Sequence, residues 1–440
     1  MSGSAASNDK EKILTVNIVR TLVVAMLVTW LTGCATQREA GPAPVTEISP
    51  QAVVVPVPAP VPAIPETPAK SAEPAPVVVL PVVPPIALPP PEVLLPPRPV
   101  EQDSRALLLQ LLPPRIKDRN GWATDMHTSF AALRIPATPE NYCAAIAVIE
   151  QESSFHADPE VAGLSRIVWK EIETRRKKYS IPKVLLDVAL LKSSPDGRSY
   201  KARINALKTE RQMNMLFEDM VAELPNGKRL FGDYNPIRTG GPMQVSIEFS
   251  EEHVHARPYP YVRQQSLRDE VFTRRGGVYF GIANLLDYAA PYSQHLYRFA
   301  DFNAGRYSSR NAAFQHAVAR LGGSKLALDG DLLRYADGAP SSQASTTQLA
   351  LQKLSKALAI NKADMLRDLK QEKAAAFSQT RLYQRVFALA DQKAGGPLPR
   401  EAIPQIKLKS PKIQRRLTTE WFAKRVDWRY RNCLGQGSGV

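Results

Sequence analysis

The sequence predicts a mainly α-helical protein with a helical insertion and a C-terminal helical extension. Two observations lead to this prediction. Beyond residue 100, apolar residues recur at intervals of three or four, which is the period of a helix face. Few runs show the strict alternation that marks a half-buried strand. Residues 101–440 are also numerous enough to bury a substantial core.

The clearest predicted helix covers residues 140–152. Thr138-Pro139 supplies a capping hydroxyl and a first-turn proline immediately before it. Tyr142, Ala145, Ile149 and Glu152 then fall on one face. That face is apolar until its last member, which is a carboxyl group.

Three further stretches complete the predicted organisation. Residues 166–238 form a charged helical insertion, and a helix starts near residue 276 and runs through residue 286. A polar stretch, 341–347, precedes another helical region at about 348–393 and a basic tail. We therefore divide the chain into a domain over 101–340, which contains the insertion, and an extension over 341–440. Within the insertion one helical stripe is expected to be core: Met213, Leu216, Phe217, Met220, Val221 and Leu224.

The first 33 residues have the features of a secretory signal peptide. Basic residues precede an apolar stretch over 21–32, which is too short to span a bilayer. The stretch ends in Leu31-Thr32-Gly33-Cys34, which resembles the bacterial lipobox. This resemblance implies that Cys34 is lipidated and anchors the protein to a membrane. Ala35 follows where an aspartate commonly marks inner-membrane retention, so we expect the periplasmic face of the outer membrane.

Residues 34–100 follow as the lipidated cysteine and a proline-rich tether. Between residues 41 and 100 the chain has 20 of its 38 prolines. Such sequence favours extended polyproline II over sheet or helix. Two interpretations stay open: a tether that carries the domain to a partner away from the membrane, or a spacer of no required length.

The formal net charge is +15. In a cytosolic protein this charge would indicate nucleic acid as the binding partner. Export of the protein excludes that partner. Anionic polymers, including cell-wall peptides, and membrane surfaces remain as possible partners.

Lipidation of Cys34 leaves two further cysteines, Cys143 and Cys433. In an oxidising periplasm these two can form a disulfide, or Cys143 can pack as a free buried thiol; both alternatives stay open.

Three short motifs point to a function. They are Glu150-Gln151-Glu152-Ser153-Ser154-Phe155, Gly241-Pro242-Met243-Gln244 and Phe302-Asn303-Ala304-Gly305. In this order they resemble the motifs of lytic transglycosylases with a goose-type-lysozyme-like domain. The whole chain is also similar to a family of uncharacterised bacterial lipoproteins.

The transglycosylase resemblance implies a lysozyme-like fold and cleavage of the bond between muramic acid and glucosamine in peptidoglycan. Glu152 would be the catalytic acid and base, and the product would be a 1,6-anhydro sugar. An apolar face and a helix C-terminus both favour a protonated carboxyl, which suits a general acid. Met243, Gln244, Phe302 and Asn303 would bind the glycan strand. No cofactor or metal is implied, since nothing near His253 and His255 completes a metal-binding pattern.

Three departures from the family pattern keep alternatives open. Pro242 replaces a leucine, Phe302 replaces a tyrosine, and the insertion lengthens the gap between the first two motifs. The insertion is a candidate surface for cell-wall protein partners. One alternative is a hydrolytic muramidase that uses Asp158, Glu160 or Glu248 as a second carboxylate. The other is a catalytically weak scaffold that binds peptidoglycan.

Overall fold

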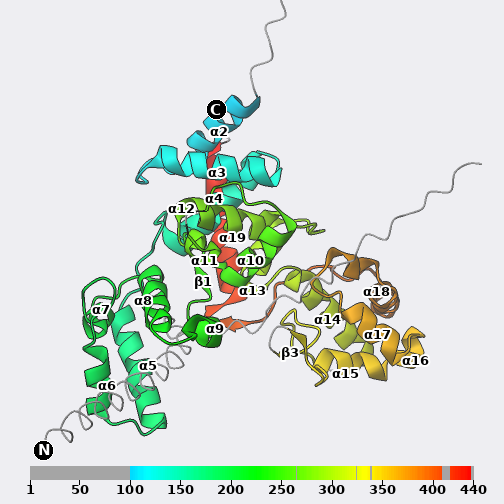
Figure 1. Cartoon of the computed structure of the whole chain (residues 1–440). Coiled ribbons are helices and arrows are strands. Elements are labelled where there is room, and N and C mark those ends of the chain that lie inside the picture. The colour runs from blue at the N-terminus through cyan, green and yellow to red at the C-terminus, as the bar shows by residue number, and fades with distance from the viewer. Residues whose placement is uncertain (1–99, 264, 324, 337–338, 409–416, 438–440) are drawn as a thin grey trace, which may run out of the picture.

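The computed structural model describes residues 100–263, 265–323, 325–336, 339–408 and 417–437 (Figure 1). The signal peptide, Cys34 and the tether lie outside the described residues. The described chain is mainly helical, with three small antiparallel sheets of two strands each. The prediction of a mainly α fold is confirmed. None of the helices in these ranges is both long enough and apolar enough to cross a membrane.

Helices from both ends of the described chain build the first hydrophobic core. Its elements are α2 (Val100–Leu111), α3 (Arg119–Leu133), α4 (Pro139–Ser153), α10 (Ile247–Ala256), α11 (Leu267–Val271), α12 (Arg274–Leu286), α13 (His295–Ala304) and α19 (Thr419–Gly437). Helix α12 is the centre of this core and packs against α3, α4, α11 and α13. It is buried on nearly all sides, which explains why its sequence is apolar or glycine throughout residues 276–283.

Helix α4 begins where the sequence predicts. The Thr138 hydroxyl accepts a hydrogen bond from the Asn141 N–H at 3.3 Å, and Pro139 occupies the first turn. The helix is buried from Tyr142 to Ile149, between α19 on one side and α2 and α12 on others. It ends after Ser153, so the predicted segment is confirmed to within a residue at each end.

Most of the insertion forms a helical lobe at the left of the molecule in Figure 1, and its last helix lies nearer the centre. Its elements are α5 (Leu164–Lys178), α6 (Lys183–Leu190), α7 (Tyr200–Asn205), α8 (Glu210–Ala222), α9 (Gly227–Phe231) and a 3-10 turn, η2 (Gly232–Tyr234). The predicted stripe of α8 is buried, and its residues join the first core. A short hairpin, β1 (Thr239–Gly240) with β2 (Val245–Ser246), then leads into α10.

A second hydrophobic core lies on the opposite side of the molecule (Figure 1). Its elements are α14 (Ser308–Gly322), β3 (Tyr335–Ala336), β4 (Ala339–Pro340), α15 (Thr346–Lys353), α16 (Ser355–Leu358), α17 (Lys362–Leu369), a 3-10 turn, η3 (Ala375–Gln379), and α18 (Arg381–Ala394). The strands β5 (Lys407–Leu408) and β6 (Leu417–Thr418) then precede α19.

The two cores do not divide at residue 340. Helix α14 belongs to the second core through Phe314 and its neighbours, whereas α19 returns to the first core through Phe422 and Val426. The buried Arg310 of α14 contributes to the second core, donating to the Ala374 carbonyl at 2.8 Å with its guanidinium 4.4 Å from the Tyr307 ring centroid. The predicted extension is thus two separate pieces, one on each core.

Candidate functional site

The three motifs of the sequence lie on elements that meet helix α12. Helix α4, which carries the first motif, packs against α12. In the second motif, Met243 fills the space beside Gly281, where a Cβ would lie 2.3 Å from the Met243 sulfur. Just after the third motif, the Arg306 side chain donates to the carbonyl oxygens of Ala283 and Asn284 at 2.6 and 3.2 Å. Segments far apart in sequence are therefore gathered around one helix.

Glu152 lies in the last turn of α4 and is half-buried. The helix ends abruptly because Ser154 and Phe155 both have left-handed backbone, with φ of 48° and 60°. Phe155 turns back into the core and meets the Trp122 ring edge-on, at 5.2 Å between centroids. The C-terminal end of a helix is unfavourable to an anion, so this position suits a carboxyl that works as an acid.

Glu150 has a structural role. Its carboxylate lies 3.5 Å from the Arg429 guanidinium of α19, on the side of α4 that faces that helix. A helix turns about 100° per residue, so Glu152 points away from this contact. Ser153 is buried and its hydroxyl donates to the Ile149 carbonyl at 3.0 Å. Glu150 and Ser153 thus contribute to the packing of α4, and the half-buried Glu152 remains the candidate acid of this motif.

The second motif is a tight turn between β1 and β2. Gln244 has left-handed backbone, its N–H donates to the Gly241 carbonyl at 3.1 Å, and its half-buried side chain lies 3.4 Å from the Thr239 hydroxyl. Met243, in contrast, has no exposed surface. Met243 was predicted to contact the glycan, and the structure corrects this prediction. The Met243 side chain packs instead against α12, in the space that Gly281 leaves because it has no side chain.

The third motif is also largely buried. Phe302 is 4% exposed and Asn303 is 8% exposed, and the side-chain amide oxygen of Asn303 accepts from the Thr419 hydroxyl at 2.8 Å. The start of α19 thus covers this motif, a contact that local sequence pattern does not reveal. The prediction that these two side chains bind the glycan is corrected: Phe302 is buried in the first core, and Asn303 attaches α13 to the C-terminal segment.

Asp301, next to this motif, organises the turn that follows. It is fully buried and accepts hydrogen bonds from the Tyr292 hydroxyl at 2.6 Å and from the backbone N–H groups of Tyr307 and Ser309. Burial raises the pKa of Asp301 to about 6, although these hydrogen bonds oppose the rise. The motif therefore ends in a rigid polar network and not in an open loop.

Several residues in or beside the motifs have an uncommon backbone conformation with positive φ. Of nine non-glycine residues with positive φ among those described, four lie in or beside the three motifs: Ser154, Phe155, Gln244 and Tyr307. Such conformations are uncommon outside glycine and concentrate at functional sites. This concentration supports the view that the region around α12 has a function beyond packing.

The candidate second carboxylates differ in their surroundings. Asp158 accepts from the Thr209 hydroxyl at 2.9 Å, and burial raises its pKa. Glu160 is exposed, 3.5 Å from Lys208, and Glu248 is exposed on α10. Glu252, one turn after Glu248, was not singled out in the sequence.

Glu252 is half-buried, and burial together with the Glu248 charge raises its pKa to about 7. Lys373 and Arg306 oppose that rise. Its spacing of four residues from Glu248 on one helix was the available sequence signal, since like charges at this spacing face each other. Glu252 is therefore a half-buried carboxyl whose pKa lies close to neutral pH.

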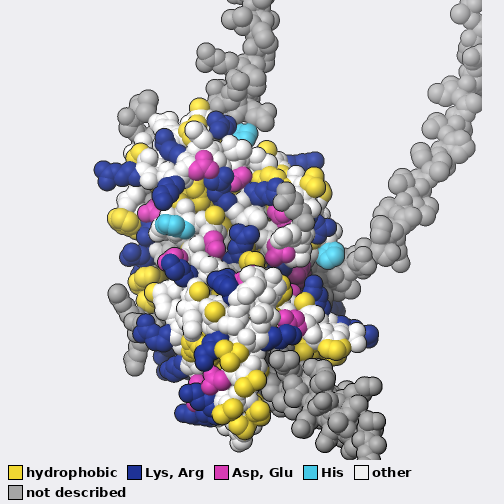
Figure 2. Space-filling model, turned by 60° about the vertical axis from the view of Figure 1, so that its left-hand side comes forward, with side chains coloured by type: hydrophobic (Ala, Val, Ile, Leu, Met, Phe, Trp, Pro, Cys, Tyr) yellow, Lys and Arg dark blue, Asp and Glu magenta, His cyan; other side chains and the backbone are white. Residues whose placement is uncertain are grey.

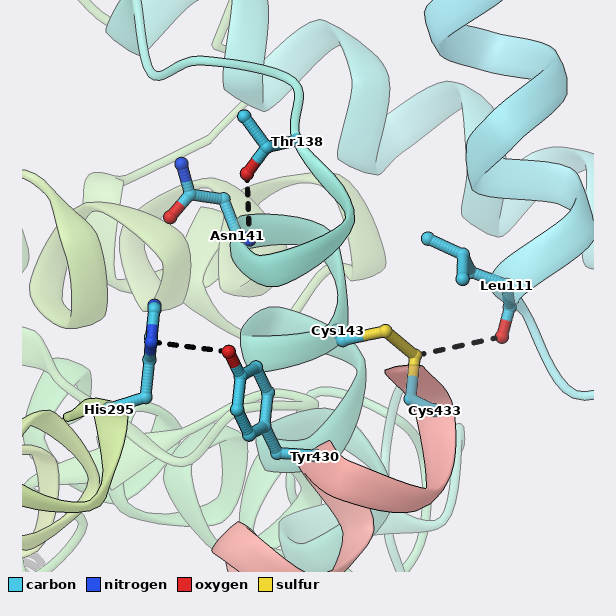
Figure 3. The surroundings of a disulfide bond; sticks show 7 residues. All are labelled: Leu111, Thr138, Asn141, Cys143, His295, Tyr430 and Cys433. Carbon is cyan, nitrogen blue, oxygen red and sulfur yellow. Dashed lines mark hydrogen bonds between the residues drawn. A yellow bond between two sulfur atoms is a disulfide. The ribbon is translucent and has the colours of Figure 1, made fainter. Parts of the chain in front are cut away.

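Cys143 of α4 and Cys433 of α19 form a disulfide (Figure 3). The disulfide alternative is thus confirmed over the free thiol. Cys433 sulfur also lies 4.0 Å from the Leu111 carbonyl, and the Tyr430 hydroxyl lies 3.3 Å from His295 Nδ1. Figure 3 shows the disulfide and Leu111 to one side of α4 and the Tyr430–His295 contact to the other, so the C-terminal helix is fixed to the helix that carries Glu152.

Within the described ranges, no group of three or more His, Cys, Asp or Glu side chains is arranged to hold a metal ion. His253 is buried, its Nε2 lies 3.2 Å from the Tyr279 hydroxyl, and burial lowers its pKa to about 4. His255 is exposed on the same helix. These two histidines therefore belong to different environments.

Residues 115–436 match the family described as "Protein of unknown function (DUF1615)". The chain belongs to this family. A relative from Escherichia coli (strain K12), named "Uncharacterized protein YaiW", is 47% identical over 345 residues, which cover 77% of this chain and 93% of the relative. No solved structure shows a significant match. The description of this family assigns no activity.

Proposed function

We propose that this member of the family is a lytic transglycosylase that cleaves peptidoglycan glycan strands, with Glu152 as its acid and base. One observation supports the proposal above the others: the three motifs, spread over residues 150–305, pack around helix α12 in one core. The lysozyme-like fold is part of the proposal. So are the lipid anchor at Cys34 and residence on the periplasmic face of the outer membrane.

In the proposed reaction, Glu152 first donates its proton to the oxygen of the glycosidic bond, and that bond to C1 of the muramic acid breaks. The resulting carboxylate then takes the proton of the 6-hydroxyl of the same sugar. The oxygen of this hydroxyl bonds to C1 and closes the 1,6-anhydro ring. Glu152 ends the reaction protonated, as it began, and no water is consumed. Gln244, half-buried beside the turn, is the side chain of the second motif that retains exposed surface to meet a sugar.

A second candidate function is a peptidoglycan-binding scaffold of low activity. The burial of Met243, Phe302 and Asn303 favours it, because these side chains contribute packing and not a sugar-binding wall. The scaffold uses the basic surface implied by the net charge of +15 to bind the anionic wall.

The decisive experiment incubates purified sacculi with the chain from residue 34 carrying Cys34→Ser, which keeps both cores and removes lipidation. Glu152→Gln and Glu252→Gln are compared with Glu160→Gln, a matched change at an exposed position. Released fragments are identified by mass spectrometry. We expect anhydro-muramyl products from all proteins except Glu152→Gln.

Each other outcome has a distinct meaning. Products with reducing ends identify the hydrolytic muramidase. Loss of products in Glu252→Gln alone transfers the acid role to α10. Binding to sacculi with no product from any protein contradicts the enzyme proposal and leaves the scaffold.

A further inference from the structure

Helix α6, at the outer end of the insertion, has an exposed apolar face. Val184, Leu185, Val188 and Leu191 are 72%, 41%, 54% and 63% exposed. Their spacing of one, four and seven residues places them on one side of the helix and its C-cap. The opposite side, with Leu186, Ala189 and Leu190, is buried. The helix is thus apolar on both sides, although only one side is needed for the core of the lobe.

Basic residues border this face at the turn between α5 and α6. Lys177, Lys178 and Lys183 are exposed, and Tyr179 between them is 53% exposed. Over residues 164–192 the chain has eight Lys and Arg against three Asp and Glu. Arg175 and Arg176 are held by Glu171 and Glu173 at 2.5 and 2.7 Å. Lys177 also lies 3.7 Å from Glu173, but its side chain stays exposed like those of Lys178 and Lys183. These three lysines therefore present positive charge to solvent.

The position of the lobe leaves this face accessible. The insertion extends from the first core on the side away from the second core (Figure 1). In the view with the lobe brought forward, hydrophobic side chains gather toward the lower end of the molecule, with lysine and arginine side chains beside them (Figure 2). We call the surface made by Lys177, Lys178, Lys183 and the four apolar residues of α6 the α6 surface.

We propose that the α6 surface binds a lipid bilayer with anionic headgroups. A short apolar helix face inserts at the boundary of the acyl chains, while lysines at its border pair with the headgroup charge. Anionic glycan or peptide would satisfy the lysines but leave the valines and leucines in water. A second copy of the same surface would place like charges together. Of these occupants, the bilayer is the one that meets both the apolar and the basic parts.

This inference is independent of the proposed catalysis, since neither Glu152 nor the three motifs contribute to the α6 surface. Single membrane attachments are weak, and a second one strengthens them. The α6 surface would thus hold the insertion, and with it the first core, in a fixed orientation close to a membrane.

The test is co-sedimentation of the chain from residue 34, with Cys34→Ser, with vesicles of phosphatidylcholine alone or mixed with phosphatidylglycerol. We expect binding to the mixed vesicles, weaker binding at high salt, and little binding to phosphatidylcholine alone. Val184→Ser with Val188→Ser should weaken binding about tenfold or more. The matched control, Val262→Ser with Leu349→Ser, changes exposed apolar residues elsewhere and should bind like the parent.

A second variant, which combines Lys177→Glu and Lys178→Glu, tests the contribution of the lysine charges. It should weaken vesicle binding roughly fivefold or more per lysine. Lys353→Glu with Lys356→Glu makes the same change of charge on α15 and α16 and is the control. All these positions are exposed, so folding, checked by thermal melting, should be unchanged. Equal binding by the α6 variants and their controls, or no binding by the parent, overturns the proposal. So does dimerisation, measured by analytical ultracentrifugation, that the valine changes abolish.

Discussion

Cys143, in the second turn of α4, is joined to Cys433, near the end of α19, by a disulfide that spans 290 residues of sequence. The two Cα atoms lie 5.6 Å apart. This bond connects the last helix of the described chain to the helix that carries Glu152, across both the insertion and the second core. Helix α19 in turn packs along α13 and covers the third motif.

Breaking this bond should destabilise the first core. A cross-link over so long a loop restricts the unfolded chain strongly, so Cys433→Ser should lower the free energy of unfolding by about 2–5 kcal/mol. Urea unfolding followed by circular dichroism measures the change. The parent treated with reductant should lose a similar amount, while the variant should be insensitive to reductant. A parent whose midpoint is unchanged by reductant would contradict a stabilising role.

Thr419→Val should loosen the third motif. The substitution keeps the shape of a fully buried side chain but removes the hydroxyl that donates to Asn303. The buried amide oxygen then lacks this donor, at a cost of about 1–3 kcal/mol. Thr346→Val, at an exposed position of α15, is the control and should cost little. If chemical denaturation gives the same loss for both, the hydrogen bond is not what secures the motif.

Gly281→Ala should disturb the second motif, because Gly281 of α12 packs against Met243 of that motif. The added Cβ would lie 2.3 to 2.8 Å from three atoms of Met243. Overpacking of this kind typically costs about 1–3 kcal/mol. Gly232→Ala adds the same methyl group where no atom lies within 4 Å. Melting temperatures of the two variants should therefore differ clearly, and release of anhydro products by Gly281→Ala should fall more than its loss of stability accounts for.

Local signals in the sequence were sufficient to predict α4, α8 and α12. The cap of Thr138 and Pro139 determines the start of α4, and the apolar stripe of α8 is buried as expected. These features depend on neighbours within a few residues, which the sequence displays directly.

The sequence could not show how distant segments pair. The polar stretch before residue 348 suggested a boundary, yet Ser345 caps α15 and is buried in the second core together with α14. The basic tail gave no local sign that Phe422 and Val426 would return to α4 and α13. The burial of Met243 against Gly281 and of Asn303 beneath Thr419 likewise depends on contacts between distant segments. Motif order alone therefore predicted which segments matter, but not which side chains they expose.

The second core should become less stable as pH rises, because of Glu372. This side chain has no exposed surface and accepts hydrogen bonds from the Tyr335 hydroxyl and the Leu332 N–H. Burial raises its pKa to about 7, from 4.5 in the unfolded chain. The folded state thus binds the proton more tightly, so its contribution to stability is fully present below pH 4.5 and is lost as pH rises through 7.

Glu372→Gln should therefore flatten the pH dependence of unfolding between pH 5 and 8 by on the order of 1–3 kcal/mol. The amide keeps one hydrogen-bond acceptor but cannot ionise. Glu251→Gln, at an exposed position of α10, is the control and should retain the parent's slope. Urea unfolding at several pH values measures the slopes, and the difference between variant and parent removes the contribution of Asp301, which titrates in the same range. Parallel curves for Glu372→Gln and the parent would mean that Glu372 is charged in the folded protein and that Lys373, beside it, offsets its burial.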